Sequence, residues 1–437
     1  MTPAVGAAVR SAAATMAVVL GALVTTLLLG QVTDVPAQAS VLAVVLSLML
    51  GRTAERGLHV GLETAAEVVV VSVAASGVAW LLLHARSLGE ALLVVGLSIG
   101  ILARRWSGVV RRAGRVVALP FLALLVTPVP VVAGGGSTGD LFVWSTVAAL
   151  VAIAWAALTA RFRSVDVAAE RPPRAGRRRI DTPTRMAVQM FVGLAVALVV
   201  GRLLFDDRWA WCVLSAYVVA SGNRGRGDVA HKAGLRVVGA VSGTVLATVG
   251  VLHVPPGERS TLVVLFVVMA VALVLRHWSY AFWAAGMTAM LSLLHAYYGS
   301  FGQSGAEQLR ERMVGVLLGS AIGLAAAWWV LPVRTRDVFR ARVADCLRAI
   351  NDQDGSFPDA LAALDQLAPT LRAGARSHPR ARAQLAAVRA LHELDQPPGG
   401  AVRRDVGRIR RSMVGRDDPA AEDLAPGLRP VLVALRP

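Results

Sequence analysis

Long apolar runs recur along the whole chain, and they constrain the fold more than any other feature of the sequence. An α-helix needs about 20 apolar residues to cross the hydrocarbon core of a bilayer, with some allowance for tilt. Hydrophobic residues make up 55% of the 437 residues and charged residues only 17%. The chain is therefore expected to be an all-α, multi-pass membrane protein. The runs predict twelve membrane-spanning helices, near residues 11–31, 38–50, 62–83, 88–103, 115–133, 141–160, 186–205, 209–221, 233–253, 260–276, 280–298 and 311–331.

One pattern occurs twice, and it relates the two halves of the chain. The stretch 103–114 returns 172 residues later as 275–286, with Arg-x-Trp-Ser in both copies. Many membrane transporters are built from such internal repeats. We therefore expect two six-helix transmembrane repeats, at residues 1–160 and 186–332. Because six spans per half is an even number, the second repeat should enter the membrane in the same direction as the first, so that the repeats are parallel.

The charges of the loops agree with this topology. Cytoplasmic loops of membrane proteins carry an excess of lysine and arginine. The opposite loops hold few cations beyond Arg86, Arg208, Arg259 and Arg310. Both termini are therefore expected in the cytoplasm, and the chain is expected in the bacterial plasma membrane. Most of the net charge of +17 then reflects the membrane topology rather than nucleic-acid binding. The arginine-rich loops that should share the cytoplasmic side lie at 52–56, 104–112, 161–185, 224–232, 276 and 334–342.

Two segments are polar and lie outside the predicted repeats. Residues 161–185 hold eight arginines and are interpreted as a basic cytoplasmic linker, either close to anionic lipid headgroups or simply solvated. Residues 333–437 are predicted to form a small cytoplasmic helical domain with an accessory role in assembly or regulation. Their apolar residues recur at helical spacing, at Phe339, Val343, Leu347 and Ile350, at Leu361, Leu364, Leu367 and Leu371, and at Leu385, Val388, Leu391 and Leu394.

The sharpest local pattern is an arginine followed by two glycines four residues apart, which we name the Arg-Gly motif. Glycines at this spacing leave a groove on one helix face, where another helix or a ligand can approach closely. An arginine one turn earlier can bind a carboxylate through two hydrogen bonds. In a second interpretation the arginines reach to the two membrane surfaces, the first to the cytoplasmic side and the second to the outer side, and the glycines serve packing alone. The two copies of the motif are Arg236, Gly239 and Gly243, and Arg312, Gly315 and Gly319.

Two carboxylates at the start of the third predicted span are candidates for proton coupling. Glu63 and Glu67 lie four residues apart and so share a helix face. Charged residues inside a membrane span are costly and often functional, so these two could carry protons. In the alternative interpretation they pair with Arg52, Arg56 or arginines of the linker at the cytoplasmic end of the span.

Motifs for enzyme chemistry are missing from the sequence. No Walker lysine follows a glycine-rich loop, and neither HExxH nor GxSxG occurs. The two cysteines, Cys212 and Cys346, have neither disulfide-framework nor zinc-site spacing. We therefore expect no catalytic residues, no metal and no cofactor.

The second half carries further stretches around the Arg-Gly motifs. They are Trp211-Cys-Val-Leu-Ser215, the glycine-rich turn 221–227 and Trp328-Trp-Val-Leu-Pro332. Together with the two motifs, they resemble the fusaric acid resistance and aromatic acid exporter family over residues 184–335. The resemblance implies export of aromatic or other organic anions, and a cytoplasmic helical region after the module. It makes Trp211 and the six residues of the Arg-Gly motifs the candidate substrate-binding residues.

Three functions are compatible with these features. The first is a secondary transporter that exports small organic anions, such as aromatic carboxylic acids, coupled to the proton gradient. The second is an anion channel, and the third is a membrane scaffold without transport. The expected partners are a small organic anion, membrane lipids, and a second copy of the chain or an accessory export subunit, with no nucleic acid.

Overall fold

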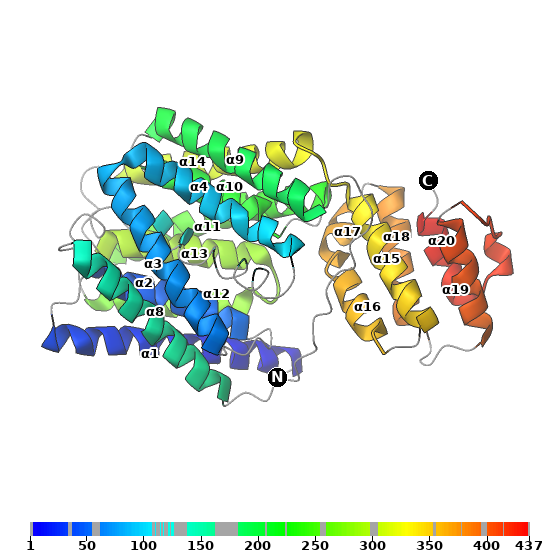
Figure 1. Ribbon diagram of the computed structural model, residues 1–437, viewed down its shortest axis with the longest axis horizontal. Coiled ribbons are helices and arrows are strands. Elements are labelled where there is room, and N and C mark those ends of the chain that lie inside the picture. The colour runs from blue at the N-terminus through cyan, green and yellow to red at the C-terminus, as the bar shows by residue number, and fades with distance from the viewer. Residues whose placement is uncertain are drawn as a thin grey trace. The chain divides into compact units, whose positions relative to one another are not determined.

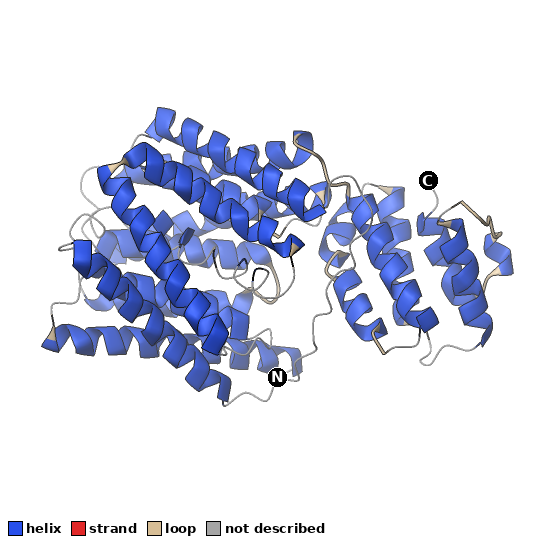
Figure 2. Cartoon of the chain, in the orientation of Figure 1, coloured by secondary structure: helices blue, strands red, loops and turns tan. Residues whose placement is uncertain are grey.

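The computed structural model is all-helical over the residues that it describes, with no strand among them (Figure 2). The expected all-α fold is thereby confirmed. The chain divides into two compact units, residues 1–221 with 232–331 and residues 222–231 with 332–437. The described residues are 3–33, 37–54, 62–106, 138–161, 182–205, 208–222, 225–253, 259–297, 305–352, 355–376, 378–394, 400–413 and 415–435, with a few positions between 110 and 125.

The first unit consists of long apolar helices (Figure 1). They are α1 (Pro3–Val32), α2 (Ala37–Ala54), α3 (Leu62–His84), α4 (Arg86–Leu102), α8 (Thr138–Arg161), α9 (Thr182–Phe205), α10 (Ala210–Ala220), α11 (Arg226–His253), α12 (Arg259–Leu275), α13 (Tyr280–Tyr297) and α14 (Gly305–Trp329), and the short 3-10 helix η1 (Ala103–Arg105) follows α4. Each of the long helices coincides with a predicted span. The predicted span 115–133 lies largely outside the described residues, as does most of the linker 161–185.

Six helices in the described part of the chain are long and apolar enough to cross a membrane. They are α1, α3, α8, α9, α11 and α14. Others, such as α10 with 11 residues, are apolar but shorter than the roughly 20 residues that a straight crossing requires. The total of twelve spans therefore stays a prediction.

The two halves of the first unit pair their helices in the same way. In the first half α1, α2 and α8 pack against one another, and in the second half α9, α10 and α14 do so. The first helix of each half also contacts the fourth helix of the other half, α1 with α12 and α9 with α4. Two parallel repeats related by a pseudo-twofold axis would be expected to show such a pair of contacts. The pairing agrees with the predicted repeat, which itself stays a prediction.

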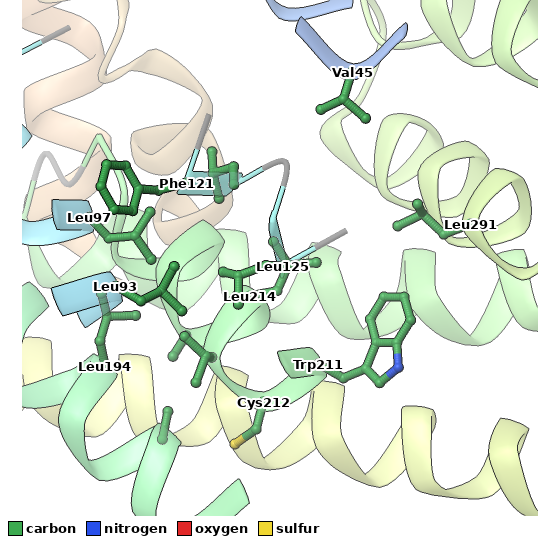
Figure 3. Close-up of a cluster of buried hydrophobic side chains, with 14 of the residues drawn as sticks. Val45, Leu93, Leu97, Phe121, Leu125, Leu194, Trp211, Cys212, Leu214 and Leu291 are labelled. Carbon is green, nitrogen blue, oxygen red and sulfur yellow. The ribbon is translucent and has the colours of Figure 1, made fainter. Parts of the chain in front are cut away.

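The short helix α10 lies in the interior of the first unit. All its residues from Trp211 to Ala216 are buried, and Figure 3 shows Trp211, Cys212 and Leu214 in one apolar cluster with Leu93 of α4 and Leu194 of α9. Helices in a membrane associate through close packing rather than through a hydrophobic driving force, because lipid tails are as apolar as leucine. A fully packed α10 therefore holds its side chains at fixed positions inside the unit.

The second unit is a bundle of shorter helices. Its apolar stripes follow the predicted spacing. Phe339, Val343, Leu347 and Ile350 are buried in the same cluster as Leu364, Leu367, Leu371, Val388 and Leu391, and the predicted Leu361, Leu385 and Leu394 are partly buried beside them. The helices are α15 (Thr335–Asp352), α16 (Phe357–Asp365), α17 (Ala368–Ala375), α18 (Pro379–His392), α19 (Gly400–Ser412) and α20 (Arg429–Leu435).

The beginning of α11 belongs to the second unit, although the sequence predicts it within the membrane half. Gly225 has a φ of +118°, which few residues other than glycine adopt, and a Cβ there would lie 2.7 Å from the Cα of Thr335. The Thr335 hydroxyl accepts a hydrogen bond from the backbone N–H of Gly227 at 3.1 Å. The Thr370 hydroxyl donates to the buried Asp228 carboxylate at 3.3 Å. These contacts explain why residues 222–231 group with residues 332–437.

Candidate functional site

The second Arg-Gly motif and Trp211 meet inside the first unit. The guanidinium of Arg312, on α14, lies over the indole ring of Trp211, on α10, with its Cζ 4.2 Å from the ring centroid. Both side chains are buried, and Arg312 is only 5% exposed. A cation over an aromatic face is attracted by the ring quadrupole, more strongly when water is excluded. Trp211 therefore holds the charge of Arg312 in place without neutralising it.

Two residues of α13 fix the same guanidinium. One Arg312 Nη donates to the Ser292 hydroxyl at 2.6 Å, and the other donates to the Thr288 carbonyl oxygen at 2.8 Å. The Ser292 hydroxyl in turn donates to that carbonyl at 3.0 Å. Because Thr288 and Ser292 are one turn apart, they present their oxygens on one helix face. Sequence reasoning missed both residues; their spacing of four in an apolar helix is the signal that marks them.

The first Arg-Gly motif supplies a second buried cation. Arg236, on α11, is 6% exposed, and Gly239, one turn further along α11, packs against Ala281 of α13. A contact between Thr244 and Met313, whose hydroxyl and sulfur are 3.2 Å apart, also joins α11 to α14. The burial of both side chains argues against the interpretation in which the two arginines reach to opposite membrane surfaces.

The glycines of the first motif allow α11 to approach α13 closely. A Cβ on Gly239 would lie 2.6 Å from the Ala281 carbonyl oxygen, and one on Gly243 would lie 2.8 Å from the Cβ of Thr288. Distances below 3.0 Å between such atoms require a shift of the neighbour. The first motif thus packs against the helix that carries the oxygens bound to Arg312.

The glycines of the second motif allow α14 to approach α10. A Cβ on Gly315 would lie 3.2 Å from the Cβ of Trp211, and one on Gly319 would lie 3.0 Å from the Cβ of Ser215. This close approach brings Arg312 onto the Trp211 ring, since the two residues lie on the facing sides of α14 and α10. The four glycines therefore position the site by packing.

Several buried polar atoms around the site have no hydrogen-bond partner among the described residues. They include the Nε atoms of Arg236 and Arg312 and the hydroxyls of Thr288 and Ser215. Buried polar groups in proteins are nearly always hydrogen-bonded, so orphaned ones call for an explanation. The buried Arg312 guanidinium offers a cation and the adjacent Trp211 ring offers an apolar surface, a combination suited to an organic anion.

The candidate proton carriers are on another helix, α3. Glu63 and Glu67 are in the first turns of α3; Glu67 is partly buried, and the side chain of Glu63 lies outside the described part of the chain. Sequence reasoning missed a more deeply buried carboxylate, Glu90 of α4, which is 7% exposed and pairs with Arg202 of α9 at 2.6 Å. The sequence feature that could have identified Glu90 is a single acidic residue within an otherwise apolar run.

Metal binding has no support in the described residues. They contain no group of three or more histidine, cysteine, aspartate or glutamate side chains that could hold a metal ion. The two cysteines are buried and free.

The comparison with protein families matches the part of the chain that holds this site. Residues 187–326 match the model of the fusaric acid resistance protein-like family. The chain carries a fusaric acid resistance protein-like module. The module reaches from α9 into α14 and contains the two Arg-Gly motifs and Trp211, so the family expected from the sequence is confirmed. No curated protein and no solved structure matches the chain significantly.

The fusaric acid resistance protein-like family is a membrane transport family rather than an enzyme family. Together with the long apolar helices, the module identifies the chain as a multi-pass membrane protein.

Proposed function

We propose that this chain is a secondary transporter that exports small organic anions, aromatic carboxylic acids among them, across the bacterial plasma membrane. The observation that supports this function best is the placement of Arg312 between the Trp211 ring and the Ser292 hydroxyl. Arginine stays charged at any physiological pH and pairs with carboxylates through two parallel hydrogen bonds. An aromatic ring beside it offers an apolar surface to the body of the ligand.

Arg236 strengthens the proposal because it is a second buried cation in the same module. In the interior of a protein the attraction between opposite charges is several times stronger than in water. Two buried guanidiniums would therefore bind an anion tightly while the surrounding helices exclude water. Neutral or cationic substrates would leave both charges uncompensated.

The proposed driving force is the proton gradient, with Glu67 and Glu63 as the candidate carriers. A carboxylate in an apolar helix can be neutral or charged. In the proposed transport cycle, its protonation accompanies the step in which the empty substrate site turns back toward the cytoplasm. Both termini and the second unit lie in the cytoplasm in this proposal. The second unit then has an accessory role, as a contact for a second copy of the chain or for an export subunit.

Uptake into inside-out membrane vesicles tests the proposal. The vesicles contain the full chain, and a panel of radiolabelled aromatic and aliphatic acids is offered with and without an imposed proton gradient. A transporter predicts saturable uptake that proceeds against the concentration gradient when protons drive it. A channel would give flux without uphill accumulation, and a scaffold would match vesicles that lack the protein.

A further inference from the structure

The second unit carries an exposed surface with an excess of positive charge. We infer that this surface binds the headgroups of anionic phospholipids at the face of the membrane. The inference concerns the second unit and does not depend on transport by the first. The surface consists of five exposed arginines, which we name the arginine patch. They are Arg334, Arg372, Arg376, Arg380 and Arg382.

The chain around the patch offers little negative charge to compensate it. Residues 366–392 hold Arg389 and four arginines of the patch, with neither aspartate nor glutamate among them. Asp365, just before this stretch, pairs with His392 at 2.8 Å. No ion pair within the described part of the chain includes an arginine of the patch. The charge of the patch is therefore available to an anionic partner.

Two helices of the second unit bring most of the patch together. The helices α17 and α18 pack against each other (Figure 1), and a Cβ on Gly374 would lie 3.3 Å from the Cβ of Ala381. Only residues 376–378 separate the end of α17 from the start of α18. Arg376 and Arg380 therefore lie at the same end of the helix pair.

A glycine of α11 brings Arg334 close to the same group. A Cβ on Gly227 would lie 3.1 Å from the Cγ2 of Thr370 and 3.2 Å from the hydroxyl oxygen of Thr335. Arg334 directly precedes Thr335, and Arg372 follows Thr370 by two residues. Because consecutive Cα atoms are about 3.8 Å apart, the Cα atom of each arginine lies within about 8 Å of that of its neighbouring threonine.

The same contacts put the patch beside the start of a helix that is long and apolar enough to cross a membrane. Gly227 and Asp228 belong to the first turn of α11, and the Thr370 hydroxyl donates to the Asp228 carboxylate. The predicted span of α11 begins at residue 233, about 8 Å further along the helix axis than Asp228. A headgroup layer is about 5–8 Å thick. On this prediction α17 contacts α11 at the level of the lipid headgroups.

A lipid surface is the partner that this placement favours. Clusters of about four to eight basic residues beside a membrane span attract anionic headgroups, and each arginine near the surface raises the affinity about fivefold. Guanidinium groups bind phosphate through two parallel hydrogen bonds. A soluble acidic partner would have to compete with the headgroups for arginines held at this level.

The fluorescence of a single label tests the inference in the full-length protein. An NBD group is attached to Ala373→Cys, an exposed position of α17, while the buried Cys212 and Cys346 stay unlabelled. The protein is placed in nanodiscs of phosphatidylcholine alone or of an equimolar mixture with phosphatidylglycerol. We expect stronger, blue-shifted emission with phosphatidylglycerol, and loss of this change at high salt because salt screens exposed charges. Equal emission in both kinds of nanodisc would overturn the inference and leave the patch to a soluble acidic partner.

Paired substitutions in the labelled protein assign the response to the patch. Arg376→Gln with Arg380→Gln should reduce the emission change at least about fivefold. Arg404→Gln with Arg416→Gln removes two exposed arginines outside the patch and should respond like the wild type. Arg376→Lys with Arg380→Lys keeps both charges and should retain the response, which also decides the matter if the first pair does not fold. An equal response of the two glutamine pairs, or loss of the response in the lysine pair, would contradict the inference.

Discussion

The guanidinium of Arg312 stacks on the indole ring of Trp211, with 4.2 Å between its Cζ and the ring centroid. The two residues come from α14 and α10, and the glycines of the second Arg-Gly motif allow these helices to meet. The stack places a charge in the interior and keeps it available to a ligand. The predictions below follow from this arrangement and from the contacts around it.

Replacing Trp211 with leucine should weaken anion binding while the fold is kept. Loss of the cation–π contact costs about 0.5–2 kcal/mol, which corresponds to a roughly 2- to 30-fold higher dissociation constant. Titration of the purified variant with a transported acid measures the change. Trp329→Leu is the matched control, because Trp329 is 79% exposed. Equal affinity of the wild type and Trp211→Leu would show that the ring has no part in binding.

Replacing Gly319 with valine should destabilise the first unit. The new Cβ would lie 2.9 Å from the carbonyl carbon of Cys212, and this backbone atom cannot move aside without shifting α10. Overpacking of this kind costs about 1–3 kcal/mol and should lower the thermal unfolding midpoint in detergent by several degrees. Gly234→Val is the control, since a Cβ at Gly234 meets nothing within 4 Å. Similar midpoints for the two variants would contradict the close packing of α10 and α14.

The pair between Glu90 and Arg202 should couple the two halves of the first unit. Its atoms approach to 2.6 Å, and both side chains are mostly buried. Glu90→Gln removes the negative charge that Arg202 contacts at 2.6 Å and should cost about 1–3 kcal/mol of stability. A double-mutant cycle with Arg202→Met measures the coupling by thermal unfolding. If the changes in unfolding free energy of the two single variants add up to that of the double variant within about 0.5 kcal/mol, the two side chains are not energetically coupled.

The thiol of Cys346 should be unreactive while the second unit is folded. Burial raises the pKa of Cys346 to about 12, and the neighbouring Asp345 adds to the rise. The thiolate is the reactive form, and an unfolded cysteine ionises near pH 8.5. Because the folded state keeps the proton that the unfolded state loses, the stability of the unit should fall as the pH rises above about 8.5.

Labelling with N-ethylmaleimide at pH 8 checks this prediction in the Cys212→Ser variant, where Cys346 is the remaining thiol. Modification should proceed only when denaturant unfolds the second unit. Rapid labelling of the native protein would contradict the burial of Cys346.

The helices could be predicted from the sequence because the bilayer sets their length. The apolar runs give the positions of α1 to α4 and of α8 to α14, and helical spacing gives the buried face of α15 through Phe339, Val343 and Leu347. The packing of one glycine in each half agrees with the predicted repeat, which stays a prediction. A Cβ on Gly114 would lie 3.0 Å from the carbonyl oxygen of Gly100, and a Cβ on Gly286 would meet Ala272, at the equivalent positions of the second half.

The contacts within the site could be predicted only in part. The Arg-Gly motifs mark Arg236 and Arg312, but whether these side chains reach the membrane surfaces or the interior depends on how α11, α13 and α14 pack. Ser292 could not be predicted as a site residue, because the hydroxyl of a serine in a membrane helix usually donates a hydrogen bond to a carbonyl oxygen of its own helix. Here it also accepts from Arg312, and this partner comes from another helix.

Gradient-driven transport by the arginine variants tests the central claim most directly. Proteoliposomes with the wild type, Arg312→Gln, Arg236→Gln or the exposed control Arg404→Gln are compared for uptake of an acid that the wild type accumulates. The account predicts that Arg312→Gln and Arg236→Gln lose at least about tenfold in kcat/KM, while the control transports like the wild type. Transport by both site variants at the wild-type rate and KM would contradict an anion site at these two arginines.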